Sequence, residues 1–213
     1  MLFNVVKRLM DITVASVGIL FFSPIMLVTA IAIKLTSKGP VFAETPKRVG
    51  MNGKTFNPYK FRSMIANAHK LLKTDPRFKK LFEEYKKSNY KLHDDPRITP
   101  VGKFIRKHSI DEVPQFLNVL KGEMSVVGPR PMYQEEVDRY IKKNPNGKKY
   151  IQQILKVSPG ITGIWQVSGR NDISFEERIK MDVKYSKEIN LVRDLKILLK
   201  TPDVVLTRKG AYE

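Results

Sequence analysis

Two adjacent carboxylates offer the clearest chemistry in the chain. Asp111 and Glu112 stand within residues 109–114, Ser-Ile-Asp-Glu-Val-Pro, just after a strongly basic segment. An ionised carboxylate can bind a divalent cation or attack a phosphorus atom. A structural interpretation is also open, in which Ser109 and Glu112 form a capping box, or Asp111 caps a helix that includes Pro114. The two interpretations are compatible, because the dipole at a helix N-terminus favours an anion.

Spaced cations near these carboxylates suit a phosphorylated ligand. Lys60 and Arg62 flank a phenylalanine at the end of an expected strand, and Arg106 lies five residues before the first carboxylate. Arg130 stands between two prolines, which restrict the backbone and lower the entropic cost of presenting the guanidinium group. Planar guanidinium groups match pairs of phosphate oxygens. Each cation alone is more often a surface residue or a carboxylate partner, and Arg130 is the least ordinary of them.

Other catalytic and metal chemistry has little support. The chain has no Cys, so disulfides, thiolate metal sites and Cys nucleophiles are excluded. His69, His93 and His108 are scattered and do not have the spacing of a zinc site. Asp94 and Asp95 precede Pro-Arg, which is more typical of a turn or a cap than of a metal site. No P-loop, dinucleotide-binding or nucleophile-elbow motif is present in the sequence.

The charge of the chain predicts an anionic partner. Lys and Arg number 39 against 21 Asp and Glu, a net charge of +18, and residues 47–108 hold 17 of the cations and 5 of the anions. Nucleic acid, anionic lipid and a phosphorylated substrate would all suit such an excess. Because no nucleic-acid-binding motif is recognisable, nucleic-acid binding would rest on charge alone.

An uncharged apolar segment dominates the N-terminal region. Residues 12–33 form a run of 22 residues without a charge. As a straight helix this run would measure ~33 Å, enough to cross the hydrocarbon core of a bilayer. A cleaved signal peptide is disfavoured, because its apolar region is usually shorter and is not preceded by an acid such as Asp11. A membrane-spanning helix and a re-entrant helix, which enters and leaves on one face, both stay open.

Two details bear on the choice between a membrane-spanning helix and a re-entrant helix. Ser23 and Pro24 fall at the middle of the run, and the proline removes one backbone hydrogen bond and bends a helix. A serine hydroxyl can satisfy a backbone group that is freed in this way. Basic residues flank both ends of the run, so the positive-inside rule gives no orientation. Both flanks would lie on one face if the helix were re-entrant.

The rest of the chain predicts a helix-rich α+β domain with few short strands. Strands are expected over 41–44 and 56–61, with a hairpin turn at Asn52-Gly53. Residues 158–171, which are punctuated by glycine, are expected to form a loop. Helices are expected from Ser63 with a break at Asp75-Pro76, from Thr99-Pro100, and over 116–120, 176–187 and 194–200.

The ordered set of motifs resembles a known family, the bacterial sugar transferases, also called monotopic phosphoglycosyl transferases. The combination is specific although each motif alone is weak, and it covers essentially the whole chain. The motifs, in order, are residues 7–11 before the apolar run with Ser23-Pro24, then 60–64, 95–106, 109–115, 118–122 and 128–131.

The resemblance implies a reaction and the residues that perform it. A sugar-1-phosphate would pass from a UDP-sugar to polyprenol (undecaprenyl) phosphate with release of UMP, starting a lipid-linked O-antigen, capsule or exopolysaccharide. Asp111 would be the nucleophile that forms a covalent phosphosugar intermediate, Glu112 would be its catalytic partner, and both could hold Mg²⁺. UDP-galactose and UDP-glucose are favoured over N-acetylated donors. Four cations would bind phosphate: Lys60, Arg62, Arg106 and Arg130.

The resemblance also implies an architecture and a location. Residues 1–38 would form a re-entrant membrane helix broken at Ser23-Pro24, and residues 39–213 a catalytic domain on the cytoplasmic face of the bacterial inner membrane. Anionic lipids are expected as partners, nucleic acid is not, and a homodimer is left open.

Residues 158–172 resemble the longer hexose-1-phosphate branch of the family. Many of its members have further membrane helices and another domain, so the chain is expected to represent the catalytic core. Trp165 and Arg170 are candidates for the nucleotide or sugar pocket or for a subunit contact, and core packing is favoured for Trp165.

Two other functions compete with this reading. A non-catalytic, membrane-anchored basic module that binds anionic lipid or nucleic acid would tolerate neutralisation of Asp111. An enzyme that transfers a bare sugar would release UDP instead of UMP.

Overall fold

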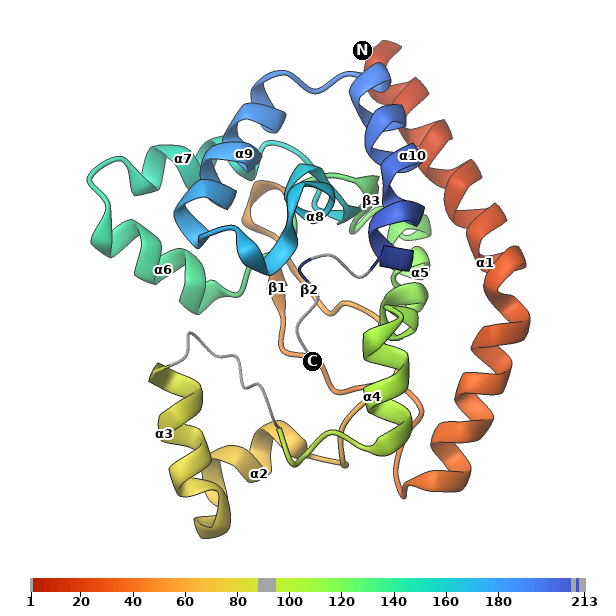
Figure 1. Ribbon diagram of the computed structural model, residues 1–213. Helices are drawn as coiled ribbons and strands as arrows, with labels where there is room; N and C mark the ends of the chain where they lie inside the picture. The colour runs from red at the N-terminus through yellow and green to blue at the C-terminus, as the bar shows by residue number, and fades with distance from the viewer. Residues whose placement is uncertain (1, 88–94, 208–209, 211–213) are drawn as a thin grey trace.

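One long apolar helix runs along a whole side of the molecule. The computed structural model describes residues 2–87, 95–207 and 210, and α1 occupies Leu2–Thr36 at one edge (Figure 1). At ~1.5 Å per residue its length is about 52 Å, longer than the hydrocarbon core of a bilayer. Among the helices that the structure describes, α1 alone is long and apolar enough to cross a membrane.

One face of α1 packs on the rest of the chain and the opposite face is bare. The bare face has the character of a surface that contacts lipid, because soluble proteins rarely leave so large an apolar area uncovered. The buried residues of α1 are Lys7, Asp11, Ala15, Thr29 and Ile33. The exposed large apolar residues include Leu9, Val17, Leu20, Phe21, Leu27, Val28, Ile31 and Leu35.

The helix continues through Pro24, where the sequence predicted a break. Proline has no backbone N–H, so the carbonyl of Leu20, four residues earlier, lacks its usual helical donor. The hydroxyl of Ser23 donates to this carbonyl instead, at 2.8 Å. The Ser-Pro pair therefore satisfies the freed carbonyl within one helix, as predicted for the serine, and the re-entrant course stays a prediction.

Two small sheets provide all the strands in the described part of the chain. Strands β1 (Arg48–Val49) and β2 (Thr55–Phe56) are antiparallel across the predicted Asn52-Gly53 turn, and Asn52 has a φ of 55°. Strands β3 (Ser125–Val127) and β4 (Gly160–Thr162) are parallel. The predicted pairing of 41–44 with 56–61 is reduced to one bridge between Phe42 and Phe61.

The prediction of a loop over 158–171 is wrong. This segment contains β4, helix α8 (Ile164–Ser168) and a 3₁₀ turn. Its glycines permit close backbone approach rather than flexibility, because a Cβ atom on Gly160 would lie 2.1 Å from the backbone nitrogen of Gly128. The pairing partner is distant in sequence, so local composition could not reveal the strand.

The helix predicted from Ser63 begins later, at Ala68, as α2 (Ala68–Thr74). Residues just before it are extended, because Met64 forms a bridge with Ile98 and the Ile65 amide donates to the Arg97 carbonyl. The tertiary pairing overrides the helical pattern there. The break at Asp75-Pro76 is confirmed, and α3 (Lys79–Lys87) follows it.

The described elements enclose three apolar cores, and the smallest, near the end of α1, includes Ile33, Phe61 and Ile105. One core lies between α1, β3 and the last two helices and includes Ala15, Val126, Tyr185 and Ile197. Another lies among the hairpin and the helices opposite α1 and includes Val49, Tyr140, Ile151 and Ile179. The helices are α4 (Pro100–Lys107), α5 (Phe116–Leu120), α6 (Gln134–Lys143), α7 (Gly147–Ile154), α9 (Phe175–Lys187) and α10 (Leu191–Thr207). The fold is thus helix-rich with few short strands, as predicted, and α10 extends further than predicted.

Candidate active site

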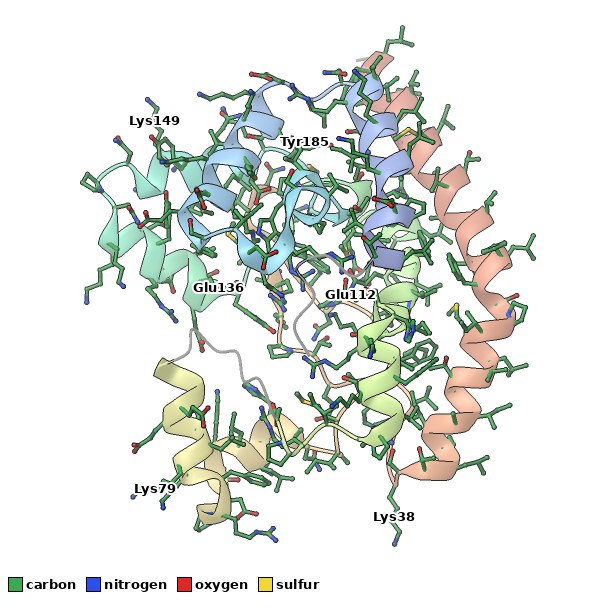
Figure 2. All side chains as sticks on the ribbon, in the orientation of Figure 1. Lys38, Lys79, Glu112, Glu136, Lys149 and Tyr185 are labelled. Atoms are coloured by element: carbon green, nitrogen blue, oxygen red, sulfur yellow. The ribbon has the colours of Figure 1, made fainter. Side chains whose placement is uncertain are left out.

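A cavity of about 880 Å³ collects the predicted site residues. Its size is in the usual range for a small-molecule site. Both carboxylates, Asp111 and Glu112, line the cavity, with side chains from the 60s segment, α4, α8, α10 and the middle of α1. Figure 2 shows Glu112 in the interior of the molecule, close to α4 and α5. Residues widely separated in sequence therefore line the same cavity.

The carboxylate pair lies on a 3₁₀ helix, η3 (Ile110–Gln115), directly after α4. The capping interpretation of this stretch is wrong. Ser109 has a left-handed backbone, with φ of 56°, and its side chain makes no capping hydrogen bond. The Glu112 side chain is engaged with cations from other elements, so it does not fold back onto the helix start.

One lysine connects the two carboxylates. The Nζ atom of Lys60 lies 2.5 Å from Oε1 of Glu112 and 3.8 Å from Oδ2 of Asp111. On the other side, Nη2 of Arg130 lies 3.4 Å from the same Glu112 oxygen. Glu112 therefore holds two cations, while the contact of Asp111 with Lys60 is longer.

Backbone contacts hold Lys60 in this place. The amide of Phe61 donates to the carbonyl of Asp111 at 3.0 Å. Asn118, which is fully buried, accepts from the Tyr59 amide at 2.8 Å and donates to the Asn57 carbonyl at 2.9 Å. The extended segment that carries Lys60 is thus fixed on both sides against η3 and α5.

The environment separates the pKa values of the two carboxylates. Burial raises the pKa of Asp111, and the charges of Lys60 and Arg106 only partly offset that effect. Burial also acts to raise the pKa of Glu112, but Lys60 and Arg130 together bring that pKa well below its ordinary value. Glu112 is therefore the firmly ionised member of the pair, and Asp111 is the member whose charge responds to its surroundings.

The other predicted cations occupy two different settings. Arg106 is exposed in the last turn of α4, lines the cavity and acts on Asp111 through its charge. Arg62 is buried and donates to the carbonyl oxygens of Pro40, Met64 and Ser37. Arg62 therefore anchors the chain just after α1, and its proposed contact with phosphate stays a prediction.

Two arginines that no sequence motif singled out support the site. Arg178 of α9 donates from Nη2 to the backbone carbonyl of Arg130 at 2.6 Å. Arg48 of β1 donates to the Pro131 carbonyl at 3.3 Å, and its guanidinium lies 3.2 Å from the centroid of the Tyr133 ring. In sequence, Arg178 resembles the partner in an ordinary helix-surface pair, so no local signal could have identified it.

The donor set at the carboxylate pair fits a hard divalent cation. Mg²⁺ is usually held by one or two carboxylates together with substrate phosphates, and Asp111 and Glu112 would supply that number. Within the described ranges there is no larger cluster of His, Asp and Glu side chains that could form a metal cage by itself. A cation here would therefore depend on the phosphates of a substrate for part of its coordination.

The remaining candidates have ordinary roles or lie outside the described residues. Asp95 pairs with Arg97 through Oδ2 and Nη2 at 2.5 Å and accepts from its amide, which is turn chemistry as predicted. His93 and Asp94 lie outside the described residues. The ring of His108 packs at 4.4 Å from that of Phe104.

Comparisons with known proteins identify the family of this chain. The family model described as bacterial sugar transferase matches residues 2–208. The undecaprenyl-phosphate galactose phosphotransferase of Salmonella typhimurium is 43% identical over 97% of this chain and 41% of its own length. The UDP-glucose:undecaprenyl-phosphate glucose-1-phosphate transferase of Klebsiella pneumoniae is 40% identical over 98% of this chain and 42% of its own length. The exopolysaccharide production protein ExoY of Sinorhizobium fredii is 38% identical over 97% of this chain and 88% of its own length.

The chain therefore spans about two fifths of the length of the longer relatives and most of the shorter one. The family match runs from the start of α1 to the end of α10 and includes every residue of the carboxylate and cation cluster. This chain belongs to the bacterial sugar transferase family.

Proposed function

We propose that the protein transfers a hexose-1-phosphate from a UDP-hexose to undecaprenyl phosphate and releases UMP. The product would start a lipid-linked exopolysaccharide, capsule or O-antigen unit. The observation that carries this proposal is the cluster of Asp111, Glu112, Lys60 and Arg130 in one cavity, which an apolar helix also lines. The names of two relatives, a galactose and a glucose phosphotransferase, support the substrate class.

The first step is an attack of the Asp111 carboxylate on the donor phosphorus that bears the sugar. A bond forms between the Asp111 oxygen and phosphorus, and the bond from that phosphorus to the bridging oxygen breaks. UMP leaves with the electron pair, and an acyl phosphate that carries the sugar stays on Asp111. In the second step, a phosphate oxygen of undecaprenyl phosphate attacks the same phosphorus. Asp111 then leaves as a carboxylate and the lipid diphosphate sugar is released.

In this reaction an anionic carboxylate attacks an anionic phosphate group. The cations of the site reduce the repulsion between them. The charges of Lys60 and Arg106 oppose the rise in the pKa of Asp111 that burial causes, and so favour the ionised nucleophile. Glu112 holds Lys60 and Arg130 close to Asp111, where they would meet the reacting phosphates. Mg²⁺ held by Asp111 and Glu112 would add positive charge where the leaving phosphate develops negative charge.

The packing of α1 supports a re-entrant anchor. Near its start, Lys7 donates to the Val127 carbonyl, and near its end Ile33 packs with Phe61 and Ile105. Both ends therefore contact the same domain, whereas a helix that crosses a bilayer has its ends on opposite faces. The catalytic domain would then lie on the cytoplasmic face, with the phosphate of the lipid acceptor at the level of the cavity.

The middle of α1 offers a route for that acceptor. Phe22 and Ile25 line the cavity beside Phe116, and the rings of Phe22 and Phe116 stack with their centroids 6.4 Å apart. These apolar side chains would receive the first part of the lipid tail, while the cations hold its phosphate.

The test is nucleotide release by the full chain in detergent with Mg²⁺, undecaprenyl phosphate and a panel of UDP-sugars. We expect UMP from UDP-galactose or UDP-glucose, and no UMP from Asp111→Asn. The matched control is Asp203→Asn, a neutralised exposed acid of α10, which should keep full activity. Omission of the lipid acceptor should leave a hexose phosphate on the protein, detectable as a mass increase that Asp111→Asn lacks.

Three outcomes would contradict the proposal. Release of UDP would indicate transfer of a bare sugar. Full activity of Asp111→Asn would exclude this nucleophile. A folded protein that forms no UMP from any donor, yet binds anionic vesicles, would favour the non-catalytic basic module.

A further inference from the structure

Two buried polar atoms in the wall of the cavity have no partner in the described part of the chain. They are Nε1 of Trp165 and Oε1 of Gln166, on α8. Trp165 is 8% exposed and Gln166 is 7% exposed, and both line the same cavity as the carboxylate pair. Buried polar atoms in native proteins nearly always have a hydrogen-bond partner, so two adjacent exceptions in the wall of a ligand cavity indicate a bound group.

Backbone packing restrains the helix that carries both residues. Helix α8 starts at Gly163, where an added Cβ atom would lie 2.2 Å from the Gly128 carbonyl oxygen, so this helix is pressed against the end of β3. The side-chain nitrogen of Gln166 donates to the Ile161 carbonyl at 3.3 Å, and its Oε1 lies 3.0 Å from the point that a Cβ atom on Gly163 would occupy, so the amide is held at the start of α8. Nε1 of Trp165 and Oε1 of Gln166 are thus an unused donor and an unused acceptor on one short helix.

The pair lies one side chain away from the reacting centre. The guanidinium of Arg130, which pairs with Glu112, lies 5.6 Å from the centroid of the Trp165 ring. The guanidinium of Arg178 lies 5.2 Å from the same centroid. These two cations lie near the ring, while the Nε1 donor of Trp165 has no partner among the described residues.

We propose that Trp165 and Gln166 bind hydroxyl groups of the donor hexose and set the selectivity for the donor sugar. A hydroxyl group can accept from Nε1 of Trp165 and donate to Oε1 of Gln166, which an apolar or charged group cannot do. The hexose is the part of the donor bonded directly to the attacked phosphorus, whereas the uracil is separated from it by a second phosphate and a ribose. The pair next to the Glu112–Arg130 contact is therefore in the right place for the sugar.

This proposal rests on the proposed hexose-1-phosphate transfer, and it extends that function to two residues for which the sequence favoured core packing or gave no role. A site that is built to hydrogen-bond a hydroxyl discriminates strongly against a ligand that presents it wrongly, since the buried partners are then left unpaired. UDP-galactose and UDP-glucose differ only in the orientation of one hydroxyl, so they are the appropriate pair of donors.

The first experiment uses the fact that Trp165 is the only tryptophan of the chain. Its fluorescence in the full-length, detergent-solubilised protein reports directly on this position. We expect UDP-hexose to change the emission, and UMP, bound to saturation as measured by calorimetry, to change it much less. An equal change with UMP would assign the position to the nucleotide, and no change with any bound ligand would also overturn the proposal.

The second experiment removes each hydrogen-bonding group. Trp165→Phe keeps a ring and loses the N–H, and Gln166→Leu loses the acceptor. We expect kcat/KM for the preferred UDP-hexose to fall about tenfold or more, the preference between UDP-galactose and UDP-glucose to narrow, and the Kd of UMP to stay within about twofold. Gln152→Leu, at an exposed glutamine of α7, is the matched control and should change none of these values.

The outcomes separate the two proposals. Unchanged donor preference in both variants would overturn the sugar-binding role, while UMP release by the unmodified protein would still support the proposed function. An equal loss of UMP and UDP-hexose binding would indicate a structural role for the two side chains. If Gln166→Leu does not fold, Trp165→Phe and the fluorescence titration still decide the question.

Discussion

Lys7 and Asp194 form a buried ion pair in which Nζ lies 2.8 Å from Oδ2, and it joins the start of α1 to the start of α10. These two helices lie side by side in Figure 1. The same Nζ is 3.0 Å from Oδ1 of Asp11, and that oxygen accepts hydrogen bonds from the Ser125 hydroxyl and the Val126 amide. The apolar helix thus carries a buried polar cluster that holds β3, the strand that leads to Arg130.

Removal of Asp194 should destabilise the protein strongly. Asp194→Ala deletes a fully buried carboxylate and leaves Lys7 with one anionic partner and Tyr185 without the acceptor of its 2.7 Å hydrogen bond. Breaking a buried ion pair in this way costs about 3–5 kcal/mol. We expect a clear drop in Tm in detergent, whereas Asp203→Ala on the exposed side of α10 should leave Tm nearly unchanged. If Asp194→Ala had the same Tm as the unmodified protein, the polar cluster would not hold α1 on the domain.

The acid limb of the activity profile should depend on Lys60. Asp111 must be ionised to attack, so activity falls as pH drops through its pKa, which burial raises above the ordinary value. The charge of Lys60 opposes that rise. Lys60→Met should therefore raise the pKa of Asp111 further and move the acid limb of kcat/KM to higher pH, in addition to lowering the rate. If the acid limb of kcat/KM stayed at the same pH in Lys60→Met, this electrostatic role would be contradicted. Lys54→Met, on the exposed hairpin, is the control for the loss of one positive charge.

The segment that carries Lys60 should depend on Asn118. Asn118→Ala removes three hydrogen bonds, from the Tyr59 amide, to the Asn57 carbonyl and to Glu123, in a fully buried position. Unsatisfied buried groups cost about 1–3 kcal/mol each, so both Tm and kcat/KM should fall. Asn146→Ala removes an exposed amide that makes no capping bond and should be neutral. A stable Asn118→Ala with full activity would mean that η3 alone positions Lys60.

Close contact between α1 and α5 should be sensitive to volume. A Cβ atom on Gly18 would lie 2.8 Å from the ring of Phe116, so Gly18→Leu should push the helices apart at a cost of about 1–3 kcal/mol. Ser16→Leu, on the exposed face of α1, should not reduce Tm. Adding Phe116→Leu should restore part of the stability lost in Gly18→Leu. Independent, additive effects in this double-mutant cycle would contradict direct contact.

Local features were predictable because short-range chemistry determines them. Thr99 caps α4 by accepting from the Gly102 amide at 2.9 Å, as the Thr-Pro start of that helix indicated. The Asn-Gly turn and the break at Asp75-Pro76 depend on backbone preferences of the same few residues. Ser109 shows that local patterns can also mislead. Its sequence matches a capping box, but the residue forms a left-handed turn between α4 and η3.

The sequence by itself determined the apolar helix, the adjacent carboxylates, the excess of cations and the family, since each is expressed in composition, order or periodicity. Only the tertiary structure decided which cations meet Glu112, what Arg62 holds, and that Trp165 and Gln166 face the same cavity. These are contacts between elements far apart in the chain, formed by the β3–β4 pairing and by the packing of α8 and α9 behind Arg130. No local pattern encodes them, because the free energy of each contact depends on the partner that folding brings to it.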